Sequence, residues 1–144
     1  MKLTVTEKFC MKQLTREWLN AAGDDLITIE NLLDNPTLTN IVAFHSQQAI
    51  EKSIKAIVEE FGIASIKTHN LQTLLIIIEE VISLSVNELI ISELDRLYID
   101  ARYPGDMGLM PNGKPTLIEA EIYFKEALKI KKQAEAFLLD YKES

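Results

Sequence analysis

The sequence contains a single cysteine, Cys10, among its 144 residues. A lone cysteine cannot form a disulfide within the chain, and its spacing builds no cysteine-based metal cluster. Free cysteines usually pack as small apolar side chains, so we interpret Cys10 as a buried or half-buried thiol. The composition therefore argues against a small disulfide-stabilised scaffold.

Long apolar runs are missing as well. The longest one, Leu74–Ile78, is far too short to cross a bilayer. The first residues, Met1–Lys8, lack the apolar stretch of a signal peptide. We therefore expect a cytoplasmic protein that makes no membrane contact.

Cations are in the minority, because 15 lysines and arginines face 22 aspartates and glutamates and leave a net charge of −7. Proteins that bind nucleic acid without sequence preference neutralise phosphates with clustered lysine and arginine. The acidic balance argues against such binding over the whole surface. Contact with RNA through one local patch stays open.

The overall composition is that of an ordinary globular protein, with 47% apolar and 26% charged residues. No internal repeat, low-complexity stretch or linker interrupts the sequence. We therefore predict a single domain over residues 1–144, with a core at about 14–141 and one long loop at 102–115.

Apolar residues recur every three or four positions in five segments, which indicates amphipathic helices. Pro36 ends the first segment and Gly62 ends the second. The segments are about 14–33, 39–61, 70–84, a fourth that starts after Ser85, and 115–141. Long amphipathic helices with short connections predict an all-α fold, an antiparallel up-and-down helical bundle of about five helices.

Two of these helices carry a capping-box spacing at their start. Ser85 is followed three residues later by Glu88, and Thr116 is followed three residues later by Glu119. Between them, the loop at 102–115 holds three glycines and three prolines, which exclude a continuous helix. The patterns predict a capped start for the fourth and the fifth helix.

Three blocks of sequence carry short motifs. Residues Phe44–Ala56 contain an aromatic residue, glutamines, a Glu-Lys pair and a later Lys-Ala pair, residues Thr68–Leu74 contain His-x-Leu, and residues Leu97–Pro104 contain Tyr-x-x-x-Arg-Tyr-Pro. In this order the blocks resemble the second helix, the start of the next helix and a later segment of the HEPN family (higher eukaryotes and prokaryotes nucleotide-binding domain). The resemblance spans about residues 14–141.

This resemblance implies a helical bundle that usually forms a homodimer. It also implies kinship with the helical partners of minimal nucleotidyltransferases, and with family members that bind nucleotides or cleave RNA. The RNA-cleaving members carry an arginine followed a few residues later by a histidine. Here no histidine follows Arg96 or Arg102, and Arg16 lies far upstream of His45, so the motif is absent.

Arg102 and Tyr103 are candidates for binding a nucleotide or a phosphate. The guanidinium group of Arg102 has a planar fork suited to phosphate, and Tyr103 could stack on a base. A structural interpretation stays open, in which Arg102 pairs with a carboxylate or with helix-end carbonyls and Tyr103 packs beneath the loop.

Four residues of the second predicted helix complete the candidate binding site: His45, Glu51, Lys52 and Lys55. They would form a polar strip along a dimer groove that faces Arg102. Alternatively, Glu51 and Lys55 are an ordinary surface pair one helical turn apart, and His45 is a hydrogen-bonded packing residue.

We expect structural roles for three further polar residues. We interpret His69 as a capping or packing residue at a helix start, and Asp24 and Asp25 as residues on a solvated helix face. Neither histidine has partners at metal-ligand spacing, so we expect no metal site and no cofactor.

These interpretations favour a non-catalytic protein, a homodimeric companion of a minimal nucleotidyltransferase in a toxin–antitoxin type of arrangement, with a nucleotide or RNA as ligand. A divergent metal-independent ribonuclease stays open as the alternative, because another group could act as the base. A nucleotide sensor is a third possibility.

Overall fold

The computed structural model describes residues 11–64, 67–102 and 113–143, and within them it is all-α with no strand. This confirms the predicted all-α helical bundle with five α-helices. The elements are α2 (Gln13–Glu30), α3 (Thr39–Glu60), α4 (Leu71–Ile77), the 3-10 helix η1 (Ile78–Glu80), α5 (Glu88–Arg102) and α6 (Leu117–Glu143).

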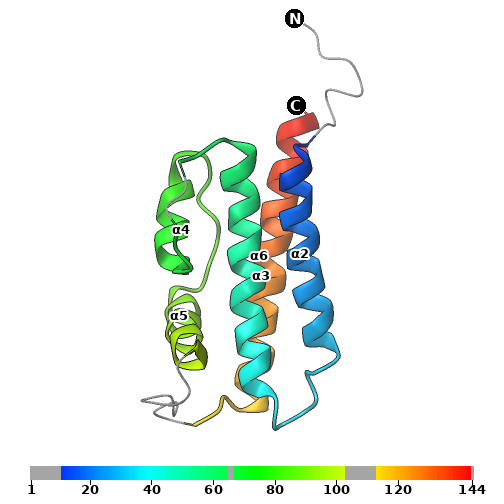
Figure 1. Ribbon diagram of the computed structural model, residues 1–144, viewed down its shortest axis with the longest axis vertical. Coiled ribbons are helices and arrows are strands. Elements are labelled where there is room, and N and C mark those ends of the chain that lie inside the picture. Colours follow the sequence, from blue (N-terminus) through cyan, green and yellow to red (C-terminus); the bar gives the residue numbers. More distant parts are fainter. Residues whose placement is uncertain (1–10, 65–66, 103–112, 144) are drawn as a thin grey trace, which may run out of the picture.

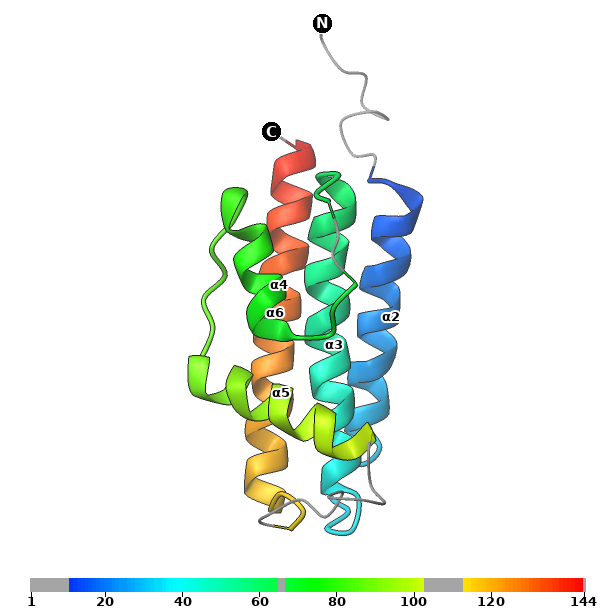
Figure 2. The ribbon, with the colours of Figure 1, turned by 60° about the vertical axis from the view of Figure 1, so that its left-hand side comes forward.

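The three long helices α2, α3 and α6 lie side by side; α3 and α6 run in the same direction and α2 runs opposite to both (Figure 1). Helix α3 is the centre of the fold, since it contacts α2, α4, α5 and α6. Helix α5 runs across the bundle rather than along it (Figure 2). The predicted antiparallel order therefore holds for α2 and α3 but is wrong for α3 and α6, because the chain between them, which forms α4 and α5 on one side of α3, returns to the end of the bundle where α3 begins.

The core is built from aliphatic residues of all five helices, and α3 contributes the most. Its buried apolar residues recur at helical spacing around nearly the whole helix, as expected for a central element. Side chains with no exposed surface include Ile29, Ile50, Ile54, Ile57, Leu71, Ile78, Ile130 and Leu138. This packing fixes the axis of α3 and hence the position of the polar side chains that it carries.

Helix α3 ends as the sequence predicts. Gly62 has a φ of +59°, a left-handed conformation that glycine adopts without steric cost. The N–H of Gly62 donates to the carbonyl of Glu59, and the N–H of Ile63 donates to the carbonyl of Val58. This is the hydrogen-bond pattern of a Schellman motif, which stops α3 at Glu60.

One of the two predicted capping boxes is confirmed and the other is wrong. The N–H of Thr116 donates to the carboxylate of Glu119, and the N–H of Glu119 donates to the Thr116 hydroxyl. At α5, the Asn87 side chain accepts from the N–H groups of Leu89 and Ile90 instead. Asn87, one residue before α5, therefore caps the helix in place of Ser85.

Helix α4 is shorter than predicted, because it ends at Ile77, η1 and a turn at Val81 follow, and residues 82–87 run extended towards α5 (Figure 2). The amide side chain of Gln133 on α6 holds this segment: it accepts from the N–H of Ser85 and donates to its carbonyl. On α6 the apolar period predicts an inward-facing Tyr141, but Tyr141 is 52% exposed and Leu138 is buried instead.

Two predictions fall outside the described residues: the environment of Cys10 and most of the loop at 102–115. Within the described ranges, no helix combines the length and the hydropathy that a membrane span requires.

Candidate functional site

Polar side chains gather along one side of α3, where an amphipathic central helix would be expected to carry apolar residues. They come from α2, from the middle of α3 and from the chain that leads into α4. We call this set the polar band, and it consists of Asp25, His45, Gln47, Glu51, Lys52, Lys55 and His69.

The first part of the band, the Asp25 cluster, joins α2 to α3. Asp25 is only 7% exposed, and its two carboxylate oxygens have different partners. One oxygen lies 2.8 Å from Nδ1 of His45, and the other accepts from Nζ of Lys52, also at 2.8 Å. One buried carboxylate thus holds two side chains of the neighbouring helix.

The second part, the Glu51 cluster, joins α3 to the segment before α4. Glu51 is 4% exposed and accepts from Nζ of Lys55 at 2.8 Å and from Nε2 of Gln47 at 3.1 Å. Nδ1 of His69 lies 3.1 Å from both carboxylate oxygens. Gln47 also donates to the carbonyl of His69, which fixes the position of that segment on α3.

Aromatic rings connect the two clusters. Phe44 meets His45 edge-on at 5.5 Å between ring centroids and stacks on Tyr98 of α5 at 5.8 Å. The Tyr98 ring lies 5.5 Å from that of His69. At the other end of the band, Nζ of Lys55 lies 5.5 Å from the centroid of the Trp18 ring on α2.

Both imidazole rings are oriented in the same way. A carboxylate next to Nδ1 favours the proton on Nδ1, so Nε2 of a neutral ring is an acceptor. Within the described part of the chain, no hydrogen bond engages Nε2 of His45 or His69. The side chains are 26% and 51% exposed. Both Nε2 atoms are therefore available to a ligand.

The charges of the band balance. Asp25 and Glu51 carry two negative charges, and Lys52 and Lys55 carry two positive charges. An anion bound at the lysines must therefore share them with the carboxylates, which limits the positive potential of the surface. Lys12, Trp18 and Lys55 also line a pocket of about 300 Å³ beside the Glu51 cluster, large enough for a small ligand.

The structure brings four of the six predicted site residues together: His45, Glu51, Lys52 and Lys55 all belong to the polar band. Arg102 is the last residue of α5, one turn after Tyr98, but its side chain lies outside the described residues. Tyr103 lies outside them too. Glu51 is buried rather than part of an exposed surface pair.

Sequence reasoning missed Asp25. Its interpretation as a solvated residue is wrong, although Asp24 beside it is exposed. A signal existed, because Asp25 follows Ala22 by three positions and precedes Ile29 by four, and both are core residues. A carboxylate on the apolar stripe of a helix indicates a buried partner.

The role expected of His69 is wrong in one respect. The cap of α4 is Asn70, whose side chain accepts from the N–H of Thr73. The His69 ring instead pairs with Glu51. No group of three or more histidine, cysteine or carboxylate side chains within the described residues is placed to hold a metal ion.

The family model of the HEPN domain matches residues 15–143. No curated protein and no solved structure matches the chain.

Proposed function

Because the chain belongs to the HEPN-domain family, we propose that it is a non-catalytic HEPN protein that binds a nucleotide at the polar band. In this proposal it acts as a homodimer and as the companion of a minimal nucleotidyltransferase, in a toxin–antitoxin type of arrangement. The companion role rests on the family resemblance, whereas the binding role rests on the polar band.

The observation that carries the binding role is the mixture of groups on one partly exposed surface. Lys52 and Lys55 can meet phosphate oxygens, and Nε2 of His45 and His69 can accept hydrogen bonds. Trp18 is half-buried and lines the pocket with Lys55, so a base in that pocket would contact its ring. Cations next to aromatic rings and imidazoles suit a ligand that combines an anion with a planar ring.

Two observations support a non-catalytic role. The arginine-to-histidine motif of the RNA-cleaving members is absent from the sequence. Cleavage also needs cationic stabilisation of a phosphorane, and the ammonium groups of Lys52 and Lys55 are already paired with buried carboxylates. A paired cation can contribute to binding but stabilises additional negative charge less than a free one.

Exposed apolar side chains support self-association. Ile27 lies near the C-terminus of α2, and Ile118 and Ile122 lie in the first two turns of α6. These two helix ends lie at the same end of the bundle (Figure 1). Apolar residues that gather at one end of a molecule are typical of a surface that contacts another protein.

Calorimetry tests the binding role. We expect ATP or GTP to bind the full chain, and Lys52→Met/Lys55→Met to weaken binding by about tenfold, or about 1.4 kcal/mol, because a lysine that is already paired with a carboxylate contributes less than the roughly 1.5–3 kcal/mol of an unshared charge-assisted hydrogen bond. Lys125→Met/Lys132→Met, on α6, is the matched control for the loss of two charges. Equal affinity of both double variants, or no heat with millimolar nucleotide, would contradict the role.

Light scattering and co-expression test the assembly. We expect the mass of a dimer in solution, and co-purification with a nucleotidyltransferase encoded beside this gene. A monomer over a wide range of concentration, or separate elution of the two co-expressed proteins, would remove this part of the proposal.

One observation favours the alternative, a divergent metal-independent ribonuclease. A carboxylate that orients an imidazole through Nδ1 and leaves Nε2 free is an arrangement used for general bases. Here the arrangement occurs twice, at Asp25–His45 and Glu51–His69. Cleavage of RNA in the presence of EDTA, lost in His45→Asn or His69→Asn, would establish this alternative. Inert wild-type protein would leave the non-catalytic role.

A further inference from the structure

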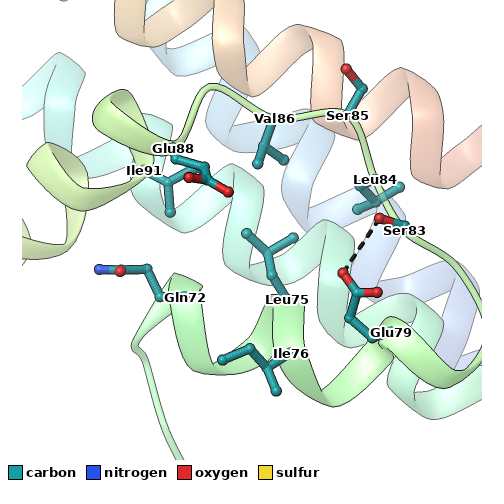
Figure 3. A pocket seen from close by; sticks show the side chains of 10 residues that line it. All are labelled: Gln72, Leu75, Ile76, Glu79, Ser83, Leu84, Ser85, Val86, Glu88 and Ile91. Atoms are coloured by element: carbon teal, nitrogen blue, oxygen red, sulfur yellow. Dashed lines mark hydrogen bonds between the residues drawn. The ribbon is translucent and has the colours of Figure 1, made fainter.

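A pocket on the side of the molecule formed by α4 and α5 is not part of the polar band. It has a volume of about 490 Å³ and lies between α4 and the extended segment 83–86 (Figure 3). Leu75 of α4 and Val86 of the extended segment point towards each other from opposite walls. Ile76 beside them is 72% exposed. Apolar side chains are thus accessible in a recess of the surface.

Along the edge of the extended segment that faces α6, the main-chain groups are hydrogen-bonded. Both main-chain groups of Ser85 pair with the amide of Gln133, and the N–H of Asn87 donates to Glu126 of α6. In an extended chain the N–H and C=O groups of successive residues point to opposite sides. The main-chain groups of Leu84 and Val86 therefore point away from α6.

The other edge is unpaired. Within the described residues, no hydrogen bond engages the main-chain N–H or C=O of Leu84 or Val86. The alternation of side chains agrees with an extended strand, because Leu84 is buried while Ser83 and Ser85 are exposed. An extended segment with a free edge beside an apolar recess is a template for the addition of another strand.

The charge around the pocket indicates which strand would fit. Glu79 and Glu88 line it, and none of the other described residues that line it is a lysine or an arginine. A second copy of this chain would bring the same carboxylates against them, on a protein of net charge −7. Like charges across an interface oppose association, whereas cationic side chains complement the carboxylates.

We propose that the segment 83–86 binds an extended peptide segment of a partner protein, in which basic and apolar residues alternate, by strand addition. The peptide main chain pairs with Leu84 and Val86. One row of its side chains enters the recess next to Leu75 and Ile76, and the other row places lysine or arginine near Glu79 and Glu88. This surface is independent of nucleotide binding at the polar band.

Fluorescence anisotropy with the full chain tests the proposal. The probe is a short blocked fluorescein-labelled peptide in which lysine alternates with valine. We expect it to bind, and we expect its glutamate–valine counterpart to bind at least about tenfold more weakly, because Glu79 and Glu88 repel its carboxylates. We expect a peptide that is N-methylated along one edge to lose most of its affinity, because that edge can no longer donate to the carbonyls of Leu84 and Val86.

Variants of the protein separate the two contributions. Val86→Pro removes one main-chain donor and should weaken binding about 2- to 10-fold, while Val86→Thr retains the donor and should bind nearly as the wild type does. Glu79→Gln/Glu88→Gln should weaken binding about 2- to 10-fold, most at low salt. Glu17→Gln/Glu30→Gln, on α2, matches the charge change away from the pocket.

Amide hydrogen exchange on the wild-type protein keeps the test decisive if Val86→Pro does not fold. Bound peptide should slow exchange at Leu84 and Val86 and leave Ser85, which is already bonded, unchanged. The proposal is wrong if the basic peptide does not bind, if the N-methylated or acidic peptide binds equally well, or if exchange at Leu84 and Val86 stays the same. Self-association that Val86→Pro abolishes would assign this edge to a second copy instead.

Discussion

The Asp25 cluster and the Glu51 cluster use the same kinds of side chain but join different parts of the fold. Each has a buried carboxylate, an imidazole bound through Nδ1 and a lysine at 2.8 Å. Asp25 reaches from α2 to two residues of α3. Glu51 pairs with Lys55 on its own helix, and its remaining long-range partner is His69.

This difference separates a structural from a ligand-facing role. The Asp25 cluster links two long helices of the bundle, so its loss affects the packing of α2 on α3. The Glu51 cluster presents the more exposed imidazole, 51% against 26%, and its Lys55 lines the pocket beside Trp18. We therefore expect substitutions in the first cluster to change mainly stability, and those in the second to change mainly binding.

The largest effect is expected for Asp25→Ala. This substitution removes the carboxylate that His45 and Lys52 share where α2 packs on α3. It should lower the free energy of unfolding by about 2 kcal/mol. The loss stays below that for a fully buried ion pair because His45 and Lys52 are partly exposed. Urea denaturation measures it. Asp24→Ala, next to it but exposed, should change stability by less than about 0.5 kcal/mol. Equal effects would remove the structural role of Asp25.

A smaller loss is expected for Glu51→Gln, about 1 kcal/mol in the same measurement, because a neutral amide binds Lys55 and His69 less strongly but keeps the shape of the side chain. Amide exchange at residues 67–70 should become faster, since His69 is released. Glu59→Gln is the control on the same helix. Unchanged exchange at 67–70 would show that Glu51 does not hold this segment.

Single lysine variants sharpen the comparison for ligand binding. Lys55→Met should weaken nucleotide binding about fivefold, or about 1 kcal/mol, and Lys52→Met about twofold, because Lys55 lines the pocket beside Trp18. Calorimetry on the two variants measures the loss of nucleotide affinity in each. A larger loss for Lys52→Met than for Lys55→Met would indicate that the ligand binds at the Asp25 cluster instead.

The smallest effect concerns the reactivity of the two imidazoles. Acylation by diethyl pyrocarbonate, followed by mass spectrometry, should proceed about twofold faster at His69 than at His45, in line with their exposed fractions. Asp25→Ala should increase the rate at His45 and leave His69 unchanged. Faster reaction at His45 in the wild-type protein would contradict the assigned exposures.

Local patterns predict much of the fold. The helix over 39–61 and its glycine stop, and the box of Thr116 and Glu119 at α6, depend on residues within one turn of each other. Such contacts form wherever the local sequence allows them. The same reasoning fails at residues 81–87, because Gln133, far along the chain, holds Ser85 in an extended conformation.

The candidate site was only partly predictable for the same reason. Resemblance to the family identifies His45, Glu51, Lys52 and Lys55, which lie within three turns of one helix. The partners that decide their chemistry, Asp25 and His69, come from other elements. The period of the apolar stripe marks Asp25 as an inward-facing residue, but no local pattern identifies which side chains it meets.

The most direct test of nucleotide binding at the polar band is an NMR titration of the full chain with ATP that follows the imidazole nitrogen signals of both histidines. We predict that the Nε2 signal of His69 shifts most and that of His45 shifts less, over one range of ATP concentration, because the Glu51 cluster is the ligand-facing one. ATP that binds, as calorimetry would report, while both imidazole signals stay in place would contradict the assignment.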